Sequence, residues 1–367
     1  MPYLIALTHN LKPVVHPADV PEDAYSEFDS VQTVQAIAAA LRAHGHRVEL
    51  VEATRDLPAW FRAHPVDLVF NIAEGIGGEA RESRVPAILD FLDIPYTGSG
   101  VLSLALALDK AKAKYLFQAG GIPTPGFQLF TDPAQLLDAS LRFPLIVKPN
   151  REGSGKGIWA SSVVTTPQEL HTQIREVWAR YDQPVLIEEF IEGTELSVGV
   201  FGNAPARAFP ILEVDFSTCE GSGERFYSWR MKEFQGNRAL RLTPTFWCPA
   251  RLPESVVARV QAAALAAHEV LDCRDVSRVD VRLDAQGTPF VLEVNPLPGL
   301  DPEESNFPRM AKAAGMTYEA LIHGIVEHVA ARTIVSSSII RPRHEQGTLA
   351  PTRAGGMAAS RPLEGGC

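Results

Sequence analysis

The sequence predicts an α/β domain with a parallel sheet at the N-terminus, followed by two units of α+β type. Strands and helices alternate over about the first 100 residues, which is typical of a parallel sheet covered on both faces. Beyond that point the pattern changes, because glycine and proline breaks separate strands that are no longer each followed by a helix. The 367 residues and the apolar content of 46% suffice for two or three hydrophobic cores.

The N-terminal α/β domain is predicted to cover residues 1–105. Its first strand is the apolar run at 3–7. The helix after it begins at Asp29 or Ser30, residue types that cap helices, and stops at Gly45. Further strands are expected at 47–52 and 66–73, and further helices at 56–65 and 79–93.

The central α+β domain is predicted to cover residues 106–205. A single helix over residues 103–120 leads into it, and a second helix begins near Pro167 and runs to residue 181. A glycine-rich loop lies between two of its strands. The strands are expected at 127–130, 144–149, 158–163, 185–191 and 195–202.

The C-terminal domain is predicted to cover residues 206–333. It contains a long helix at 254–271, a hairpin at 277–295 and a closing helix at 317–332. The tail at 334–367 is rich in Ser, Gly, Pro and Ala without an apolar period, so we expect it to be disordered.

Composition restricts the function classes. The formal net charge is −10 and no Lys/Arg-rich block is present, which argues against nucleic acid or an anionic membrane as partner and favours a small polar substrate. We identify no secretory signal and no run of 18 apolar residues. The four cysteines are scattered without the spacing of metal ligands, which is typical of proteins in a reducing compartment. A cytoplasmic location is therefore expected.

The hairpin places acids together. Because side chains alternate along a strand, Asp280 shares one face with Arg278, and Glu293 shares a face with Asn295. The turn should bring Asp280 within about one residue pair of Glu293. Two carboxylates at that range repel unless a cation lies between them, and oxygen ligands in small number suit Mg²⁺. A solvated polar face on an ordinary hairpin remains the alternative.

Lys148 ends a strand and is followed by a loop with Gly153, Gly155 and Gly157. The loop does not match a P-loop, because Asn150 stands where the first glycine belongs. A glycine loop between strands can fold over a triphosphate as a lid and offer backbone N–H groups. A plain glycine-rich turn beside a lysine fits equally well.

Acids also interrupt the apolar run at 185–200. Glu188, Glu189, Glu192 and Glu195 accept but do not donate hydrogen bonds, so near a nucleotide they suit the adenine amino group and the ribose hydroxyls. A solvated strand edge is as good an explanation for this segment taken alone. Lys110 by itself is typical of a solvated helix residue.

Seven segments in order resemble the D-alanine–D-alanine ligases of the ATP-grasp superfamily, over residues 66–310. They are IPYTGSGVLSLALALDKAKAK, GGIPTPG, LIVKPNREGSGKGI, LIEEFIEGTELSVGV, FYSWRMKEF, WCPA and RVDVRLDAQGTPFVLEVNPLPG. The resemblance implies an ATP-grasp fold with a Rossmann-like N-terminal domain. It also implies a ligase that phosphorylates one amino acid with ATP and joins it to a second, as in peptidoglycan biosynthesis, and a homodimer.

The resemblance assigns roles to individual residues. Lys110, Lys148 and Lys232 would contact the ATP phosphates, and Ser154 would lie in the lid. Arg278 would stabilise the acylphosphate and the tetrahedral intermediate. Glu188 and Glu189 would lie beside the adenine, Glu195 would bind the ribose, and Ile191 would belong to the nucleotide site. Asp280, Glu293 and Asn295 would bind Mg²⁺ or Mn²⁺, and Gly299 and Ser305 would contact the amino-acid substrate.

Departures from the family fall on amino-acid recognition. The glycine-rich turn ending in a substrate-binding Glu is replaced by ALTHNLKP, and the usual His-Gly segment by NIAEGIGGEARES. Glu233 follows Lys232, and Ser305 fits the family serine only with a one-residue insertion. Asp301, Glu303 and Glu304 surround Ser305, which suggests a more cationic acceptor than D-alanine or simply acids facing solvent.

Three other functions remain open at this point. The chain could be a ligase for other amino acids or for a hydroxy acid, a kinase acting on a small molecule without ligation, or a nucleotide-binding module without catalysis. The joint presence of Lys148, Arg278, Asp280, Glu293 and Asn295 speaks against the inactive module.

Overall fold

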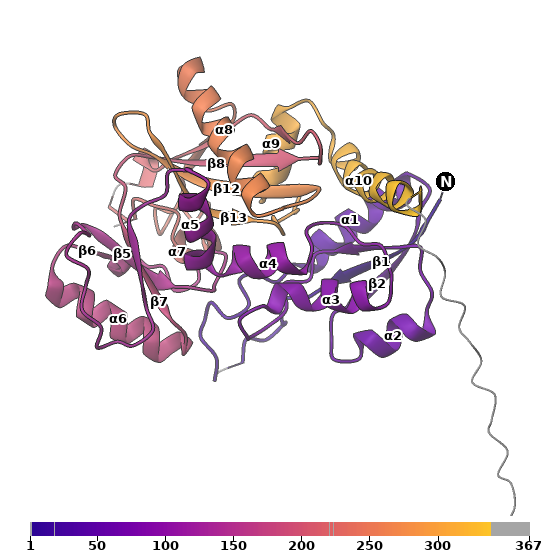
Figure 1. The fold of residues 1–367 in the computed structure, drawn as a ribbon, viewed down its shortest axis with the longest axis horizontal. Coiled ribbons are helices and arrows are strands. Elements are labelled where there is room, and N and C mark those ends of the chain that lie inside the picture. Colours follow the sequence, from indigo (N-terminus) through magenta and orange to yellow (C-terminus); the bar gives the residue numbers. More distant parts are fainter. Residues whose placement is uncertain (1, 18, 220, 223, 339–367) are drawn as a thin grey trace, which may run out of the picture.

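The computed structural model describes residues 2–17, 19–219, 221–222 and 224–338. Three lobes follow one another along the chain and meet around a common centre (Figure 1). The N-terminal lobe packs beside the last helix of the chain, and the central lobe lies at the opposite end of the molecule (Figure 1).

The N-terminal lobe is built on a three-stranded parallel sheet of order β2-β1-β3. Helix α1 begins where predicted, because the Ser30 hydroxyl caps it by accepting from the backbone N–H of Thr33, and Gly45 follows its end with a φ of 84°. The elements are β1 (Leu4–His9), α1 (Val31–Ala43), β2 (Arg47–Glu52), α2 (Leu57–Ala63), β3 (Leu68–Asn71), η1 (Arg81–Ser83) and α3 (Arg84–Phe91).

The single helix expected over residues 103–120 is wrong. Two helices stand there, α4 (Val101–Leu108) and α5 (Lys110–Ala119). Asp109 between them has extended backbone dihedrals and caps α5 by accepting from the N–H of Lys112. The apolar period runs through the break, so periodicity alone did not reveal the new N-cap.

The central lobe has a four-stranded antiparallel sheet of order β4-β7-β5-β6 with α6 against it. The strand expected at 158–163 is wrong, since only Val163 and Val164 pair with the sheet and residues 160–162 form a 3₁₀ turn. The elements are β4 (Phe127–Phe130), β5 (Leu145–Pro149), η2 (Ala160–Ser162), β6 (Val163–Val164), α6 (Pro167–Tyr181) and β7 (Val185–Glu189).

The C-terminal lobe contains a six-stranded sheet of order β11-β10-β8-β12-β13, with β9 paired to β8. Strand β8 precedes the predicted boundary at residue 206 and nevertheless pairs with β10 and β12, so this sheet takes a strand from the segment assigned to the central domain. Its strands are β8 (Thr194–Phe201), β9 (Arg207–Ala208), β10 (Leu212–Asp215), β11 (Thr245–Trp247), β12 (Val276–Leu283) and β13 (Pro289–Asn295).

Helices cover both faces of this sheet. Helix α8 packs with β8, β12 and β13 in one hydrophobic cluster, while α9 and α10 belong to a second cluster that they share with β1, β3 and α1. The second cluster therefore ties the N-terminal lobe to the C-terminal one. The helical elements are η3 (Ser217–Cys219), α7 (Trp229–Glu233), α8 (Glu254–Val270), α9 (Asn306–Ala313) and α10 (Tyr318–Ser338).

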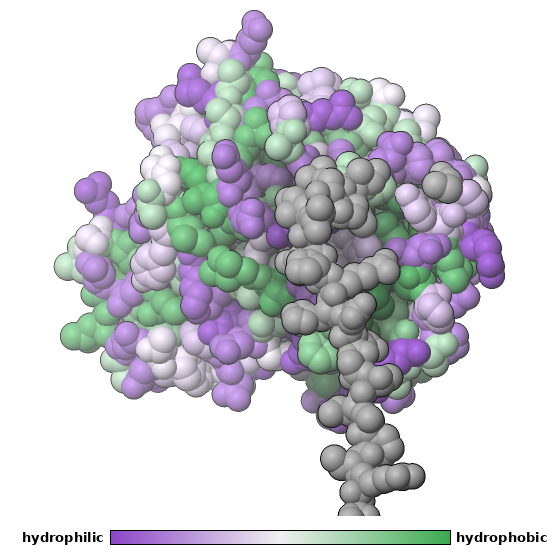
Figure 2. Space-filling model, turned by 45° about the vertical axis from the view of Figure 1, so that its right-hand side comes forward, coloured by the Kyte–Doolittle hydropathy of each residue, from purple (hydrophilic) through white to green (hydrophobic). Residues whose placement is uncertain are grey.

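Helix α10 runs to Ser338, so the first five residues of the segment expected to be a disordered tail are helical. The rest of that prediction lies outside the described residues. Within the described ranges, no helix has the length and apolar character needed to cross a membrane. On the face in Figure 2, hydrophobic residues occur in patches separated by hydrophilic ones.

Candidate active site

A cavity of about 430 Å³ lies where the three lobes meet. Its wall includes the β12–β13 hairpin, the glycine loop after β5, and the segments that follow β1 and β3. Every residue to which the family resemblance assigned a role lines this one cavity: Lys110, Lys148, Ser154, Glu188, Glu189, Ile191, Glu195, Lys232, Arg278, Asp280, Glu293, Asn295, Gly299 and Ser305. Glu192 does not line it.

Buried lysines gather at one end of the cavity. The ammonium of Lys148 lies 2.8 Å from one carboxylate oxygen of Glu188, and the ammonium of Lys114 lies 2.9 Å from the other. Burial would raise the pKa of Glu188, but the two lysines outweigh it and hold this pKa below its usual value. Glu188 therefore acts here as the counter-charge of two lysines, and its assignment beside the adenine stays a prediction.

Lys114 was missed by the sequence reasoning. It follows Lys110 by one helical turn on α5, and that spacing was the available signal. Its side chain is fully buried and donates to the Thr124 hydroxyl at 2.7 Å. Burial lowers the pKa of Lys114 to about 8, because the attraction of Glu188 only partly offsets the loss of hydration.

The hairpin register matches the prediction, since Asp280 pairs directly with Glu293 across β12 and β13. The Asp280 carboxylate accepts two hydrogen bonds from the Arg278 guanidinium, at 2.9 and 2.8 Å, and one from the Ser197 hydroxyl at 2.8 Å. Asn295 donates its amide N–H to Asp280 at 3.2 Å, which leaves the Asn295 carbonyl oxygen as an acceptor.

Glu293 lies on the side of the hairpin facing the lysines. One of its oxygens is 3.2 Å from the ammonium of Lys110. Although burial opposes ionisation, Lys110, Lys148 and Lys232 hold the pKa of Glu293 far below its usual value. This carboxylate is therefore ionised at neutral pH. Its second oxygen, Oε1, is not the one that contacts Lys110.

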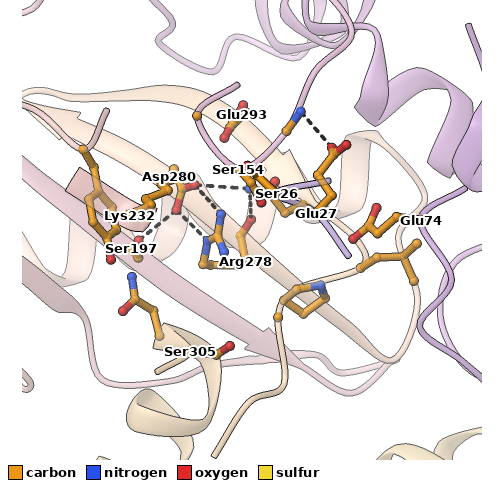
Figure 3. Close-up of a pocket in the computed structure, with 18 of the residues that line it drawn as sticks. Ser26, Glu27, Glu74, Ser154, Ser197, Lys232, Arg278, Asp280, Glu293 and Ser305 are labelled. Atoms are coloured by element: carbon orange, nitrogen blue, oxygen red, sulfur yellow. Dashed lines mark hydrogen bonds and ion pairs between the residues drawn. The ribbon is translucent and has the colours of Figure 1, made fainter. Parts of the chain in front are cut away.

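A further cation, Lys232, lies near Arg278 of the hairpin. Lys232 on α7 lies 5.0 Å from the centre of the Tyr227 ring, and burial together with nearby Arg278 lowers its pKa. Figure 3 shows Lys232, Arg278 and Asp280 on one side of the cavity, with Glu27 and Glu74 on the other. Positive charge is thus fixed where negative charge on substrate oxygens would need stabilisation.

The acids assigned to the nucleotide differ in their contacts. Glu195 accepts from the backbone N–H of Tyr227 at 3.2 Å and lies 3.5 Å from Arg282, and burial raises its pKa. Glu189 accepts from the backbone N–H of Arg142 at 3.1 Å. Ile191 lines the cavity beside them.

The glycine loop is folded over the cavity. Ser154 and Gly155 both have positive φ, of 50° and 74°. A Cβ on Gly155 would lie 2.9 Å from the backbone nitrogen of Trp229, so the close approach of loop and α7 requires glycine at this position.

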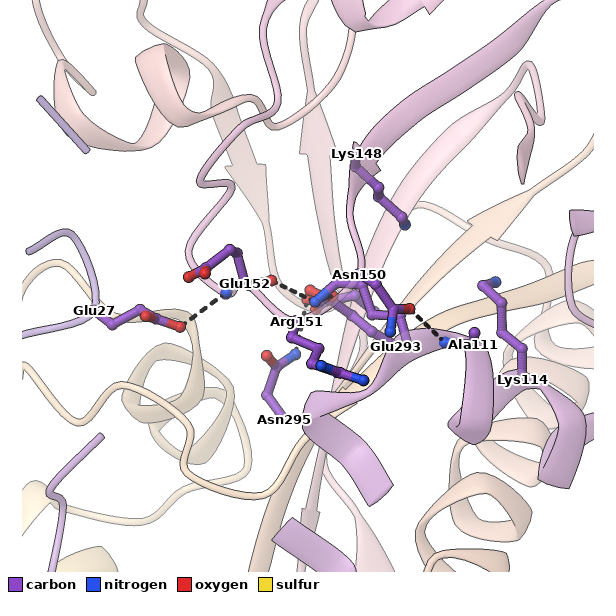
Figure 4. A network of polar contacts seen from close by, with 12 residues as sticks. Glu27, Ala111, Lys114, Lys148, Asn150, Arg151, Glu152, Glu293 and Asn295 are labelled. Atoms are coloured by element: carbon purple, nitrogen blue, oxygen red, sulfur yellow. Dashed lines mark hydrogen bonds and ion pairs between the residues drawn. The ribbon is translucent and has the colours of Figure 1, made fainter. Parts of the chain in front are cut away.

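A segment between β1 and α1 holds this loop in place. One Glu27 oxygen accepts the N–H of Gly153 at 2.8 Å, and Figure 4 shows Glu27 beside the loop at Glu152. The same oxygen accepts a guanidinium N–H of Arg81 at 2.5 Å, while the other oxygen lies 3.2 Å from Lys156. Asp23 accepts from Gly157 N–H at 2.9 Å and from the Tyr181 hydroxyl. Sequence reasoning missed these contacts, because Glu27 and Asp23 lie more than 120 residues before the loop that they hold.

Asp301 and Ser305 are partly engaged with each other. The Ser305 hydroxyl accepts from the Asp301 N–H at 3.1 Å and remains free to donate. The Asp301 carboxylate accepts from the backbone N–H groups of Glu303 and Glu304 and from the Thr33 hydroxyl. Its charge is thus stabilised locally, so it no longer argues for a cationic acceptor.

Comparison with known proteins decides the family. The family model described as "D-ala D-ala ligase C-terminus" matches residues 116–327. The D-alanine–D-alanine ligase of Halalkalibacterium halodurans is 38% identical over 302 residues, which cover 81% of this chain and 93% of that protein. The chain belongs to the D-alanine–D-alanine ligase family. An uncharacterized protein of Sinorhizobium fredii, y4sG, is 34% identical over 83% of this chain and 89% of its own length.

A crystal structure of the D-alanine–D-alanine ligase from Bacillus anthracis complexed with ATP has the same fold, with a TM-score of 0.71 and 25% identity over 91% of this chain and 99% of that one. The predicted ATP-grasp fold and the predicted class of ATP-dependent ligase are confirmed. The roles of individual residues within the D-alanine–D-alanine ligase family remain predictions for this chain.

Proposed function

We propose that the protein uses ATP to join the carboxylate of one amino acid to the amine of another, with D-alanine or a close relative as substrate. The observation that carries the proposal is the convergence, in one cavity, of the buried lysines, the Asp280–Glu293 pair and Arg278. An ATP-complexed structural relative supports the nucleotide.

The cavity wall suits a magnesium nucleotide. Asp280, Glu293 and the carbonyl oxygen of Asn295 are the residues that would hold Mg²⁺ or Mn²⁺, and the amide orientation of Asn295 fits this because its N–H₂ already faces Asp280. The metal would neutralise charge on the phosphates. Lys148 and Lys110 would contact the phosphates from the other side.

The residues present account for both chemical steps. In the first, an oxygen of the donor carboxylate attacks the γ-phosphorus, ADP leaves, and an acylphosphate forms. In the second, the acceptor amine attacks the acyl carbon and the C–O bond to phosphate breaks. Arg278 and Lys232 stabilise the negative charge on oxygen in both steps. The lid, held by Glu27 and Asp23, excludes water from the labile acylphosphate.

The test is a phosphate-release screen of D- and L-amino acids, singly and in pairs, with ATP and Mg²⁺, followed by mass measurement of the product. A ligase releases phosphate only when an amine acceptor is present and yields a product of dipeptide mass. ADP formation that does not depend on an acceptor would favour a kinase. A hydroxy acid as the best acceptor would make the product an ester.

Small-molecule amino acids are the proposed partners, and neither nucleic acid nor membrane is among them. Cys219, Cys248 and Cys273 are free thiols, which supports a cytoplasmic location. A homodimer is the expected assembly, and sedimentation velocity would test it.

A further inference from the structure

Negative charge exceeds positive charge on the cavity wall opposite the hairpin. Four carboxylates face two cations there. A third cation, Lys110, donates to the backbone carbonyl of Glu152, but its charge is paired with Glu293 of the hairpin at 3.2 Å, so two negative charges of the wall have no cation of their own. The carboxylates are Glu27, Glu74, Glu82 and Glu152, and the cations are Arg81 and Lys156. One oxygen each of Glu27, Glu74 and Glu82 lies within 4.8 Å of the others.

The unmatched charges belong to Glu74 and Glu82. Glu27 is fully engaged by Gly153, Arg81 and Lys156. Glu74, by contrast, makes no hydrogen bond or ion pair with any residue that the structure describes. Glu82 is 8% exposed, and its ion pair with Arg81 is long, at 4.0 Å, because the same guanidinium is engaged by Glu27 at 2.5 Å. Both carboxylates line the cavity, so a ligand can reach them.

An independent observation in the same cavity also points to a ligand. Asn71, at the end of β3, is 4% exposed and lines the cavity. Its carbonyl oxygen accepts from the Thr8 hydroxyl at 2.8 Å and from the Ala73 N–H at 3.2 Å, which fixes the orientation of the amide. Its N–H₂ group then has no partner within the described part of the chain. Such a buried donor calls for an acceptor oxygen.

A ligand that carries both a cation and an oxygen acceptor satisfies the whole wall. A bare metal ion does not, because the N–H₂ of Asn71 cannot coordinate it and Glu27 has no free oxygen to offer. An ammonium group has three donors, which match the free oxygens of Glu74 and Glu82.

We propose that Glu74 and Glu82 determine specificity for an acyl donor that carries a second cationic group, such as a diamino acid. The inference rests on the proposed ligase function, since it names the donor class of the same cavity. One unmatched charge suits the α-ammonium of any amino acid, and the other requires a further cation. Without that cation the wall does not favour two ionised carboxylates, and both carboxyl groups bind protons more readily. Burial raises the pKa of Glu82 to about 7 despite the attraction of Arg81, and burial and Glu82 raise the pKa of Glu74 well above its usual value.

The test compares donors that differ only in the second charge. D-lysine and D-norleucine have the same chain length, and each is paired with D-alanine in the wild-type enzyme with ATP and Mg²⁺. Fragmentation of the product shows which amino acid supplied the carbonyl. We expect kcat/KM for D-lysine as donor to exceed that for D-norleucine by about 100-fold or more, because a site with buried polar groups rejects analogues that cannot satisfy them.

Glu74→Gln and Glu82→Gln should each reduce this preference by at least about tenfold, mainly through KM. The matched control is Glu79→Gln on the same loop, whose side chain is 76% exposed and should leave the preference unchanged. Melting temperatures show whether each variant folds. Glutamine has the same shape and removes repulsion, so no loss of stability is expected.

Three outcomes would overturn the inference. Equal kcat/KM for lysine and norleucine as donors would contradict a cationic donor and leave the ligase function intact. The same conclusion would follow if D-alanine were the best donor and both Glu variants kept the wild-type ratio of kcat/KM for lysine to that for norleucine. A second bound Mn²⁺ per chain, lost in Glu74→Gln with no change of donor preference, would identify a metal site instead. No product from any pair would contradict the ligase proposal itself.

Discussion

Replacement of Glu188 by Gln tests the electrostatic arrangement at the lysine end of the cavity. The substitution keeps the side-chain shape and removes the counter-charge of two ammonium groups, at 2.8 and 2.9 Å. The Glu188 side chain is 1% exposed and those of Lys114 and Lys148 are at most 6% exposed. The small energies of surface ion pairs therefore do not apply to this substitution. The expected loss in the free energy of unfolding is that of a broken buried ion pair, about 3–5 kcal/mol.

Urea unfolding followed by tryptophan fluorescence measures this loss. The double variant Glu188→Gln with Lys114→Met should recover part of it, because one of the two stranded charges is then removed. Glu189→Gln is the matched control, since among the residues that the structure describes its carboxylate accepts only from the backbone N–H of Arg142. A loss below about 1 kcal/mol, together with a changed preference between ATP and GTP, would refute the ion-pair reasoning and restore Glu188 to the adenine.

Three further predictions concern the hairpin, the lid and a buried histidine. Asp280→Asn and Glu293→Gln should each lower turnover by about 100-fold or more and raise the Mg²⁺ concentration for half-maximal activity; near-normal values in both would refute the metal assignment. Glu27→Gln keeps an acceptor for Gly153 and loses two ion pairs, so trypsin cleavage at the lid should accelerate on the order of tenfold, and an unchanged rate would show that Glu27 does not hold the lid. Burial lowers the pKa of His268 to about 4 against a weak opposing effect of Asp272, so the unfolded chain binds a proton between pH 6.5 and 4 that the folded chain does not. Stability present above pH 6.5 is lost as the pH falls, by up to about 3 kcal/mol relative to His268→Gln, and parallel pH curves for the two proteins would contradict this.

Features set by local pattern could be predicted from the sequence. The hairpin register follows from two-residue alternation and a turn, so the pairing of Asp280 with Glu293 was accessible. The start of α1 follows from its capping residue, and the start of α6 from Pro167 in its first turn. All of the residues to which the family resemblance assigned a role line one cavity because the order of the motifs constrains the fold.

Features that depend on distant contacts could not be predicted. The hydrogen bond from the N–H of Gly153 to Glu27 joins residues that are 126 positions apart. Nothing in the sequence around Glu27 indicates this contact. The unmatched charge of Glu74 is visible only once neighbouring carboxylates and cations can be counted in space. The helix break at Asp109 was hidden for a different reason, since apolar residues on both sides keep the helical period.

Transfer of oxygen from substrate to phosphate tests the central claim most directly. The donor amino acid is labelled with oxygen-18 in both carboxylate oxygens and incubated with ATP, Mg²⁺ and the acceptor. If an acylphosphate forms and an amine displaces it, the C–O bond breaks and each phosphate released carries one labelled oxygen. Mass measurement of the phosphate should therefore show a single label per turnover. Phosphate without label would contradict the acylphosphate route and the ligase mechanism built on these residues.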